Sequence, residues 1–336
     1  MKFVSIKDIA NKVGVSTTTV SFVLNGKAKE KRISEDLKNE ILRIAAQLNY
    51  RPNQVARGLR TGQTHTLGLI IEDISNPFFG NLAKVVEEEA DKHGYSVMFC
   101  STDNLEHRAS GLLSILKHRQ MDGFLITPTP GLREDVSRLV EEQRPLVLID
   151  RYFPGLETSY VAVDNYQGAF DATNYLLGKG YKRIALVTTA STQVQMQNRQ
   201  RGYTAALAAA GMMADDELTL KVGFDLSPQQ AVSAISGFIT QTKPDAVFFT
   251  TNYLGVYGLE SLRISGVTIP ADMGIVCFDD HDLFRLGKPA VTVVAQPIHA
   301  IAVQAVESLI EQLQTKHETQ ILRKVLLEPA LIVRDT

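Results

Sequence analysis

The chain has 336 residues, enough for a small head domain and one or two larger domains. A hydrophobic content of 44% and a net charge of −2 are typical of a folded globular protein and exclude a disordered chain. The opening residues, MKFVSIKDIANK, lack the apolar core of a signal peptide, and no stretch is long and apolar enough to cross a membrane. We therefore expect a cytoplasmic protein. Cys100 and Cys277 lie in apolar runs and read as free thiols, and the histidines lack metal-ligand spacing, so neither metal nor cofactor is expected.

The charge is distributed unevenly along the chain. Residues 1–64 carry twelve Lys and Arg against five Asp and Glu, a local balance of +7, which leaves 23 basic and 32 acidic residues in the remainder. A basic segment on an acidic body is the distribution expected when one end contacts nucleic acid. Alternatively, the cluster of Lys27, Lys29, Lys31 and Arg32 is simply a solvated loop.

Residues 6–25, IKDIANKVGVSTTTVSFVLN, predict two short helices joined by a tight turn. Apolar side chains recur at three- and four-residue spacing. Gly14 can adopt the left-handed conformation that ends the first helix, and Ser16 is a typical N-cap for the second. The small Ala10 lets the helices approach and Val20 fills the angle between them, which is the pattern of a helix-turn-helix.

The exposed face of the second helix indicates what this motif contacts. Hydroxyl side chains crowd its N-terminal end: Ser16, Thr17, Thr18, Thr19 and Ser21. Because threonine is a mediocre helix former, helix stability alone does not explain this run. Short hydroxyls reach phosphate oxygens and base edges, and threonine methyls can touch the methyl group of thymine. The motif therefore favours a DNA-binding helix over a purely structural hairpin.

The next segments predict the rest of the head and a linker. Ser34 is placed to cap a third helix, whose apolar face closes a three-helix head. Residues 53–64, NQVARGLRTGQT, begin with a short helical pattern that carries the charges of Arg57 and Arg60 and the apolar side chain of Leu59. This segment is either a plain linker or a hinge that inserts into a DNA groove.

From Thr66 onward, apolar runs such as TLGLII, GFLIT, RIALVT and GIVCF alternate with amphipathic helical patterns. Continuous apolar strands between such helices are typical of parallel sheets that are buried on both faces. The alternation predicts two doubly wound α/β lobes, with a ligand site between them at the carboxyl ends of the strands. We expect one lobe to comprise residues 66–163 with 295–320 and the other 164–294 with 321–336.

The sequence does not predict an enzyme. It contains no glycine-rich phosphate loop after a strand, no GxSxG elbow and no Cys–His motif. Asp279 and Asp280 could form an acid–base pair, but hydrogen bonding to a ligand explains them better at the end of an apolar strand.

Together these motifs resemble the lactose-repressor (LacI/GalR) family of bacterial transcription regulators over essentially the full length. The matching stretches are IKDIANKVGVSTTTVSFVLN, NYRPNQVARGLRTGQT, LGLIIEDISNPFF, MDGFLIT, LIDR, VDNYQGA, GYKRIALV, NRQRGYTAAL and VCFDD. The resemblance implies a small all-α helix-turn-helix head (1–52), a hinge (53–64) and a two-lobed domain similar to periplasmic sugar-binding proteins (66–336).

The resemblance also implies partners. Members form homodimers, sometimes tetramers, that bind a pseudo-palindromic double-stranded DNA operator under allosteric control by a small ligand, here a sugar or sugar phosphate. We expect a repressor of carbohydrate-metabolism genes, with induction or co-repression left open. The alternative is a periplasmic-type sugar-binding protein without a regulatory role, which would not need the basic head.

By position, the resemblance assigns DNA contacts to Ser16, Thr17, Thr18, Ser21, Phe22, Asn25, Arg57, Leu59 and Arg60. Thr17 and Thr18 match the main base-reading pair of the family, whereas Phe22 stands where members often have Arg or His. Phe22 either contacts a base through apolar atoms or packs against the head. Leu59 matches the leucine that wedges into the minor groove, and Gly58 beside it is expected to weaken the hinge helix in the absence of operator.

The same resemblance assigns the effector site to Phe78, Phe79, Thr127, Asp150, Arg199, Asn252, Asp279 and Gln296. Carboxylates and amides bond vicinal hydroxyls, a guanidinium donates a fork of N–H groups, and an aromatic ring stacks on a sugar face. Tyr253 stands where the family usually has Asp, so we expect that edge of the pocket to be more apolar.

Overall fold

The computed structural model describes residues 4–50, 63–315 and 321–336. The chain forms two compact units, Met1–Thr64 and His65–Thr336. Within the described ranges, no helix has the length and apolar character needed to span a membrane.

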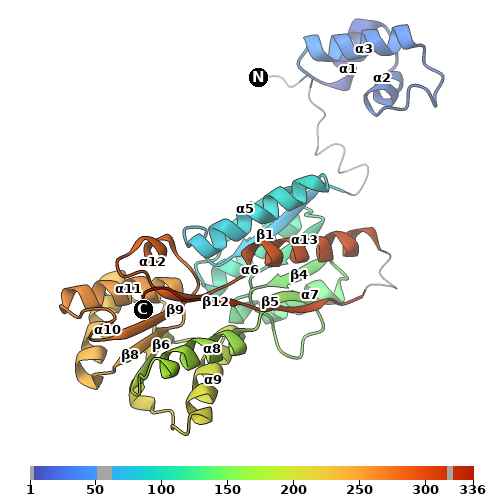
Figure 1. Ribbon diagram of the computed structural model, residues 1–336. Coiled ribbons are helices and arrows are strands. Elements are labelled where there is room, and N and C mark those ends of the chain that lie inside the picture. Colours follow the sequence, from blue (N-terminus) through green and yellow to red (C-terminus); the bar gives the residue numbers. More distant parts are fainter. Residues whose placement is uncertain (1–3, 51–62, 316–320) are drawn as a thin grey trace. The chain divides into compact units, whose positions relative to one another are not determined.

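The described residues of the first unit form a bundle of three helices (Figure 1). They are α1 (Ile6–Val13), α2 (Thr17–Leu24) and α3 (Glu35–Gln47). The side chains of Ser16 and Ser34 cap α2 and α3, and Gly14 ends α1 with a φ of 78°. Ala10 and Val20 are buried between the helices. The predicted helix-turn-helix, its caps and its glycine turn are therefore confirmed.

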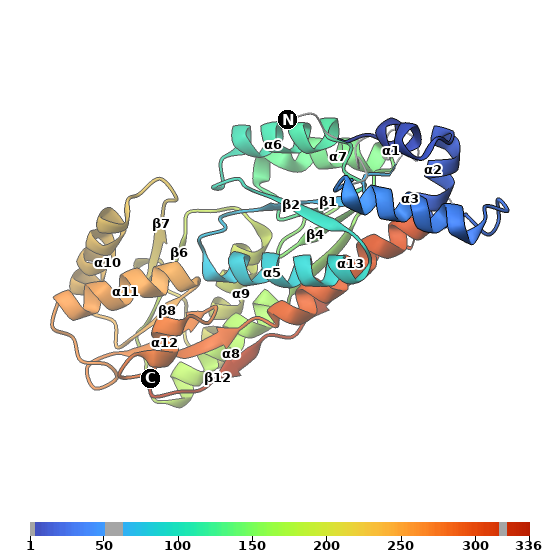
Figure 2. The same ribbon diagram turned by 90° about the horizontal axis from the view of Figure 1, so that it is seen from above.

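The second unit contains two six-stranded sheets (Figures 1 and 2). The first sheet, ordered β11-β5-β4-β3-β1-β2, is parallel and comprises β1 (Thr66–Ile71), β2 (Ser96–Ser101), β3 (Gly123–Ile126), β4 (Leu146–Ile149), β5 (Ser159–Val163) and β11 (Lys324–Leu327). The second sheet, ordered β12-β10-β9-β8-β6-β7, comprises β6 (Ile184–Thr189), β7 (Thr219–Val222), β8 (Ala246–Phe249), β9 (Gly274–Phe278), β10 (Thr292–Ala295) and β12 (Ala330–Ile332), with β12 antiparallel to its neighbour. The predicted fold class is confirmed.

Helices cover both faces of each sheet, as Figure 2 shows. One face of the first sheet is covered by α5 (Pro77–Lys92) and α13 (Ile298–Gln314), and the other face by α6 (Glu106–His118) and α7 (Arg133–Glu141). One face of the second sheet is covered by α8 (Asn165–Gly178) and α9 (Val194–Ala209), and the other face by α10 (Pro228–Thr242) and α11 (Asn252–Ile264). Shorter helices are η1 (Pro130–Leu132), η2 (Asp216–Leu218) and α12 (Asp282–Leu286). In β1, Leu67 and Leu69 pack toward α5 and α13, whereas Ile70 packs toward α6. This alternation is what buries both faces of the sheet.

The chain crosses between the lobes after β5, after β10 and between β11 and β12. The expectation that residues 321–336 belong wholly to the second lobe is wrong, because β11 pairs with β5 in the sheet of the first lobe. Its side chains are exposed or half-buried, and its place is fixed by the long-range backbone pairing with β5 and by Val325 and Leu327, which pack against the core.

Close packing of α8 on α9 generates a prediction about Gly202. A Cβ atom at this position would lie 2.2 Å from the carbonyl oxygen of Tyr166, which is backbone and cannot move aside cheaply. We expect Gly202→Ala to lower the free energy of unfolding by about 2 kcal/mol or more. The control is Gly237→Ala in α10, where an added Cβ meets no atom within 4 Å. It should be neutral or stabilising by up to ~1 kcal/mol. Urea unfolding of both variants measures the difference, and equal losses would contradict the packing argument.

Candidate DNA-binding and ligand sites

The start of α2 presents hydroxyl groups to solvent. Thr17 and Thr18 are exposed, while Val20 and Val23 on the opposite side of the helix are buried. The Ser16 hydroxyl accepts a hydrogen bond from the backbone N–H of Thr19 at 3.0 Å, so its first role is to cap the helix. Thr17 and Thr18 are thus free to face a groove, as the sequence predicts for base readers.

The remaining residues assigned to α2 make contacts within the head. Asn25 Nδ2 donates to the backbone oxygen of Ser21 at 2.7 Å and closes the end of the helix. Phe22 is half-buried, and the Lys31 ammonium lies 5.4 Å from its ring centroid, within cation–π range. This contact favours the packing role for Phe22.

The residues assigned to the hinge, Arg57, Leu59 and Arg60 with Gly58, lie outside the described residues. Their proposed roles stay predictions.

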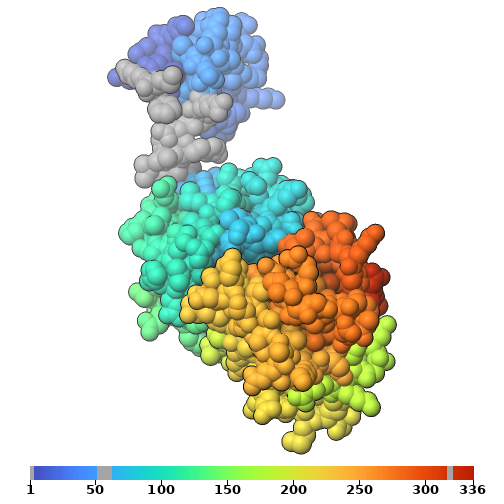
Figure 3. All heavy atoms as spheres, turned by 90° about the vertical axis from the view of Figure 1, so that its left-hand side faces the viewer, coloured from blue at the N-terminus to red at the C-terminus, as the bar shows by residue number. Residues whose placement is uncertain are grey.

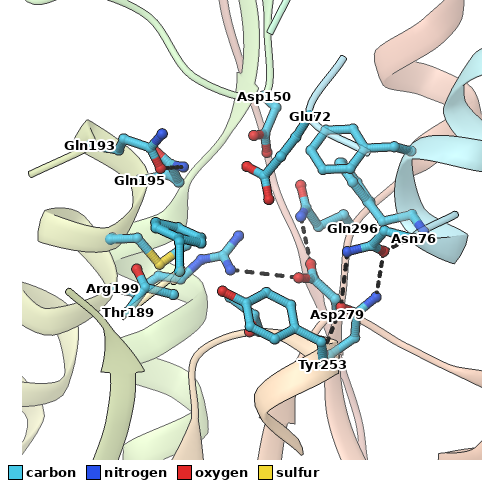
Figure 4. Close-up of a pocket in the computed structure, with 16 residues that line it drawn as sticks. Glu72, Asn76, Asp150, Thr189, Gln193, Gln195, Arg199, Tyr253, Asp279 and Gln296 are labelled. Atoms are coloured by element: carbon cyan, nitrogen blue, oxygen red, sulfur yellow. Dashed lines mark hydrogen bonds and ion pairs between the residues drawn. The ribbon is translucent and has the colours of Figure 1, made fainter. Parts of the chain in front are cut away.

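In the second unit, a cavity lies between the two lobes and opens to solvent (Figure 4). It is lined by Glu72, Asn76, Phe78, Phe79, Asp150, Thr189, Gln193, Gln195, Met196, Arg199, Phe224, Thr251, Asn252, Tyr253, Asp279 and Gln296. Most of these residues follow a strand or begin a helix, which is where ligands bind in doubly wound sheets. On the face drawn in Figure 3, the cyan and green residues of the first lobe lie directly against the yellow and orange residues of the second.

Two carboxylates occupy equivalent places in the two lobes. Asp150 directly follows β4 and Asp279 directly follows β9. Both have left-handed backbones, with φ of 68° and 72°, and each donates its backbone N–H to the next strand of its sheet, at Val161 and Val294. Such strain in residues other than glycine concentrates at functional sites. The two halves of the domain therefore each deliver one carboxylate to the shared cavity.

Burial dominates the ionisation of both carboxylates. Desolvation raises the pKa of Asp150 to about 6, against the opposing effect of the Arg151 charge. Desolvation also raises the pKa of Asp279, and here Arg199 opposes the shift. The Arg151 guanidinium is itself paired with Glu72 at 2.5 Å.

Arg199 is almost wholly buried, and its fork of N–H groups bonds the protein itself. Its Nε donates to Asn165 Oδ1 at 2.8 Å, and its Nη1 donates to the Thr250 carbonyl at 2.5 Å and lies 3.6 Å from Asp279 Oδ2. Its guanidinium also stacks 3.5 Å from the Phe278 ring centroid. Arg199 thus holds together the residues of the cavity wall, in addition to presenting its guanidinium to a ligand.

Amide side chains join the lobes at the edges of the cavity. Asn252 Nδ2 donates to Asn76 Oδ1 at 2.9 Å, and Gln193 Nε2 donates to Asn104 Oδ1 at 3.1 Å. Asn76 and Asn104 belong to the first lobe, whereas Asn252 and Gln193 belong to the second. The lobes are therefore in contact around the cavity in this structure.

The structure brings seven of the eight residues assigned to the effector site to the cavity. Thr127 is the exception: it follows β3 but is completely buried and does not line the cavity. The sequence assignment omitted Glu72, Thr189, Gln193, Gln195 and Phe224, among others. Tyr253, which the sequence places at the edge of the pocket, does line the cavity. Asn76 lies two residues before Phe78 and could have been found by that neighbourhood.

Comparison with known proteins finds a matching family description for each of the two units. The family description "Bacterial regulatory proteins, lacI family" matches residues 5–53, and "Periplasmic binding protein-like domain" matches residues 173–336. The transcriptional regulator DegA of Bacillus subtilis is 30% identical over 333 residues, covering 98% of this chain and 97% of DegA. The ribose operon repressor of Haemophilus influenzae is 30% identical over 334 residues, covering 99% of this chain and 98% of the repressor.

Solved structures agree in fold. The lac repressor dimer bound to operator and the anti-inducer ONPF superposes with a TM-score of 0.87 at 19% identity, covering 100% of this chain and 99% of that chain. A LacI-family regulator from Enterococcus faecium with bound ribose gives a TM-score of 0.70 at 26% identity, covering 80% of this chain and 97% of that chain. These relatives are regulators rather than enzymes. With a helix-turn-helix head, a two-lobed ligand-binding body and full-length relatives of this kind, the chain belongs to the LacI family of bacterial transcriptional regulators.

Proposed function

We propose that this regulator reads its operator through Thr17 and Thr18 and is controlled by a small sugar-type effector in the cavity between the lobes. The observation that carries the proposal is the convergence of polar side chains from both lobes on one cavity. Carboxylate, amide and guanidinium groups next to aromatic rings suit a hydroxylated ring. The ribose operon repressor and the ribose-bound regulator among its relatives support a sugar as the ligand class.

The proposed mechanism couples the cavity to the crossovers between the lobes. Gln296 lies in the crossover after β10 and donates to Asp279 Oδ1 at 2.5 Å. Asn165, which Arg199 holds, begins α8 directly after the crossover from β5. A ligand bonded to Asp279 therefore acts on groups that set the angle between the lobes.

In a homodimer, that angle would set the separation of two heads. Only one separation matches successive major grooves of a pseudo-palindromic operator. Ligand and operator are then linked by a coupling free energy that acts equally in both directions. The match of residues 5–53 to the DNA-binding head of lacI-family regulators favours a regulatory role over that of a periplasmic-type binding protein.

Thr18→Ala tests the reading head. We expect affinity for an operator selected in vitro with the wild-type chain to fall about tenfold, because one base contact is lost. Affinity for random DNA of equal length should stay within about twofold, since phosphate contacts supply it. Thr204→Ala, an exposed threonine on α9, is the control and should change neither. Equal losses on both DNAs for Thr18→Ala would refute the assignment.

Asp150→Asn tests the effector site. Because hydrogen bonds to a charged group are the stronger ones, we expect effector affinity to fall about tenfold or more while operator binding without effector is retained. Titration calorimetry and operator titration measure the two properties. The control is Asp91→Asn, an exposed position on α5, which should leave both unchanged. Normal effector affinity in Asp150→Asn would show that the ligand binds elsewhere.

The same variant should stabilise the unliganded protein in a pH-dependent way. Between the ordinary pKa of 3.8 and the folded pKa of about 6, the folded state binds more protons at Asp150 than the unfolded state does. The contribution of Asp150 to stability therefore falls as the pH rises through this window. At pH 7.5, Asp150→Asn should raise the free energy of unfolding by about 3 kcal/mol at most. The gain should fall to roughly half at pH 5 by the same linkage. Urea unfolding at both pH values checks this, and a pH-independent gain would contradict it.

A further inference from the structure

Carboxylates outnumber cations on the cavity wall. Among its described lining residues, Glu72, Asp150 and Asp279 carry negative charge and Arg199 carries positive charge. Arg199 is balanced by Asp279, and Glu72 is balanced by Arg151 behind it. Asp150 Oδ2 lies 3.4 Å from Arg151 Nε, a longer distance than the 2.5 Å between Arg151 and Glu72, and Asp150 is only 6% exposed to solvent. The charge that is left uncompensated in the cavity is therefore negative.

The amide groups of the cavity offer acceptors rather than donors. Gln195 Nε2 donates to Gln193 Oε1 at 3.1 Å, and Gln296 Nε2 donates to Asp279. The carbonyl oxygens of Gln195 and Gln296 are buried and have no hydrogen-bond partner in the described chain. Figure 4 shows these amides around the space that Asp150 enters. Buried acceptors without partners are costly unless a ligand supplies N–H or O–H donors.

One opening beside the cavity has the same sign of charge. This opening shares Asn76, Asn252 and Tyr253 with the cavity, and its lining includes the carboxylates of Glu72, Asp73 and Asp103. Glu72 is paired with Arg151 and Asp103 with Arg108, so Asp73 is the carboxylate that no described ion pair balances. No lysine or arginine stands among the described residues that line it. An anion approaching from this side therefore meets the carboxylate of Asp73 and no balancing cation among the described lining residues.

A second opening, on the side of Gln193, has two arginines but little free cationic charge. Arg151 donates to Glu72 through Nη2, and its Nε lies 3.4 Å from Asp150 Oδ2, so two carboxylates share its charge. Its Nε and Nη1 are buried and form no hydrogen bond in the described chain. Arg133 is exposed to solvent and donates to the carbonyl oxygen of Pro154 at 3.1 Å. Solvent screening makes an exposed cation a weak anchor for a phosphate group.

We propose that the cavity selects an uncharged, hydroxyl-rich ligand and rejects the phosphate esters of the same sugar. The inference rests on the proposed effector function and narrows its ligand class. Sugar hydroxyls donate to Asp150 and to the free oxygens of Gln195 and Gln296. A phosphate monoester carries about −1.5 to −2 charges at pH 7 and offers mainly acceptors, so it would face carboxylates and acceptors alike.

The test uses the full chain and matched pairs of ligands: D-glucose with glucose 6-phosphate, D-ribose with ribose 5-phosphate, and D-fructose with fructose 1-phosphate. Thermal shift identifies binders, because a ligand of the native state raises the melting temperature, and calorimetry gives the affinities. We expect at least one free sugar to bind and its ester to bind about tenfold more weakly or worse. An ester that binds as tightly as its sugar, or more tightly, overturns the inference but leaves the proposed function intact. Failure of every sugar and ester to bind counts against the proposed function itself.

Glu72→Gln provides a second readout. Removal of this carboxylate releases the Arg151 guanidinium and lowers the negative charge of the cavity. We expect the ratio of sugar affinity to ester affinity to narrow several-fold, even if both affinities fall. The matched control is Glu157→Gln, which removes the partner of Lys324 in an exposed ion pair and leaves the described cavity lining unchanged. An unchanged ratio in Glu72→Gln, with the fold retained, would show that charge does not set the selection.

Discussion

The second lobe, its crossovers and the cavity depend on the hydrogen bonds and the ion pair that the buried guanidinium of Arg199 forms. It joins Asn165 at the start of α8, Thr250 after β8 and Asp279 after β9. Gln296 then ties Asp279 to the crossover that follows β10. Breaking a buried pair of this kind costs about 3–5 kcal/mol, because the remaining charge has no solvent. The strand ends, two crossovers and one cavity wall consequently form a single network rather than separate parts.

The equivalence of Asp150 and Asp279 explains why the ligand site lies between the lobes. Each half of the domain ends a central strand in a left-handed aspartate whose backbone is fixed by the next strand. Neither carboxylate is well solvated, and desolvation raises the pKa of both. The unliganded protein therefore stores unfavourable free energy at the point where a ligand could relieve it, which is a common origin of the trade-off between stability and function.

Much of this site was predictable from the sequence. The family resemblance assigned Asp150 and Asp279 to the site, and their places directly after apolar runs agree with that assignment, because the carboxyl ends of parallel strands meet at one edge. The bond between Asn76 and Asn252 could not be predicted, since it joins residues 176 positions apart and neither asparagine has a distinctive local pattern. The lobe to which Lys324–Leu327 belongs was mispredicted for a related reason. An edge strand with only partly buried side chains is placed by its backbone partner and by the core it packs against, and local periodicity encodes neither.

The contacts between the lobes are weak enough for a ligand to control them. The pairs Asn76–Asn252 and Asn104–Gln193 are neutral hydrogen bonds, each contributing about 1 kcal/mol net. Moving a two-state equilibrium from 1:99 to 99:1 requires a difference of about 5.5 kcal/mol, so these amides bias the angle between the lobes without fixing it. Hydrogen bonds from a ligand to Asp150 in one lobe and Asp279 in the other contribute about 1.5–3 kcal/mol each, because both acceptors are charged. Two such bonds are comparable to the required difference, and they form together only when the lobes stand close enough for one small ligand to reach both.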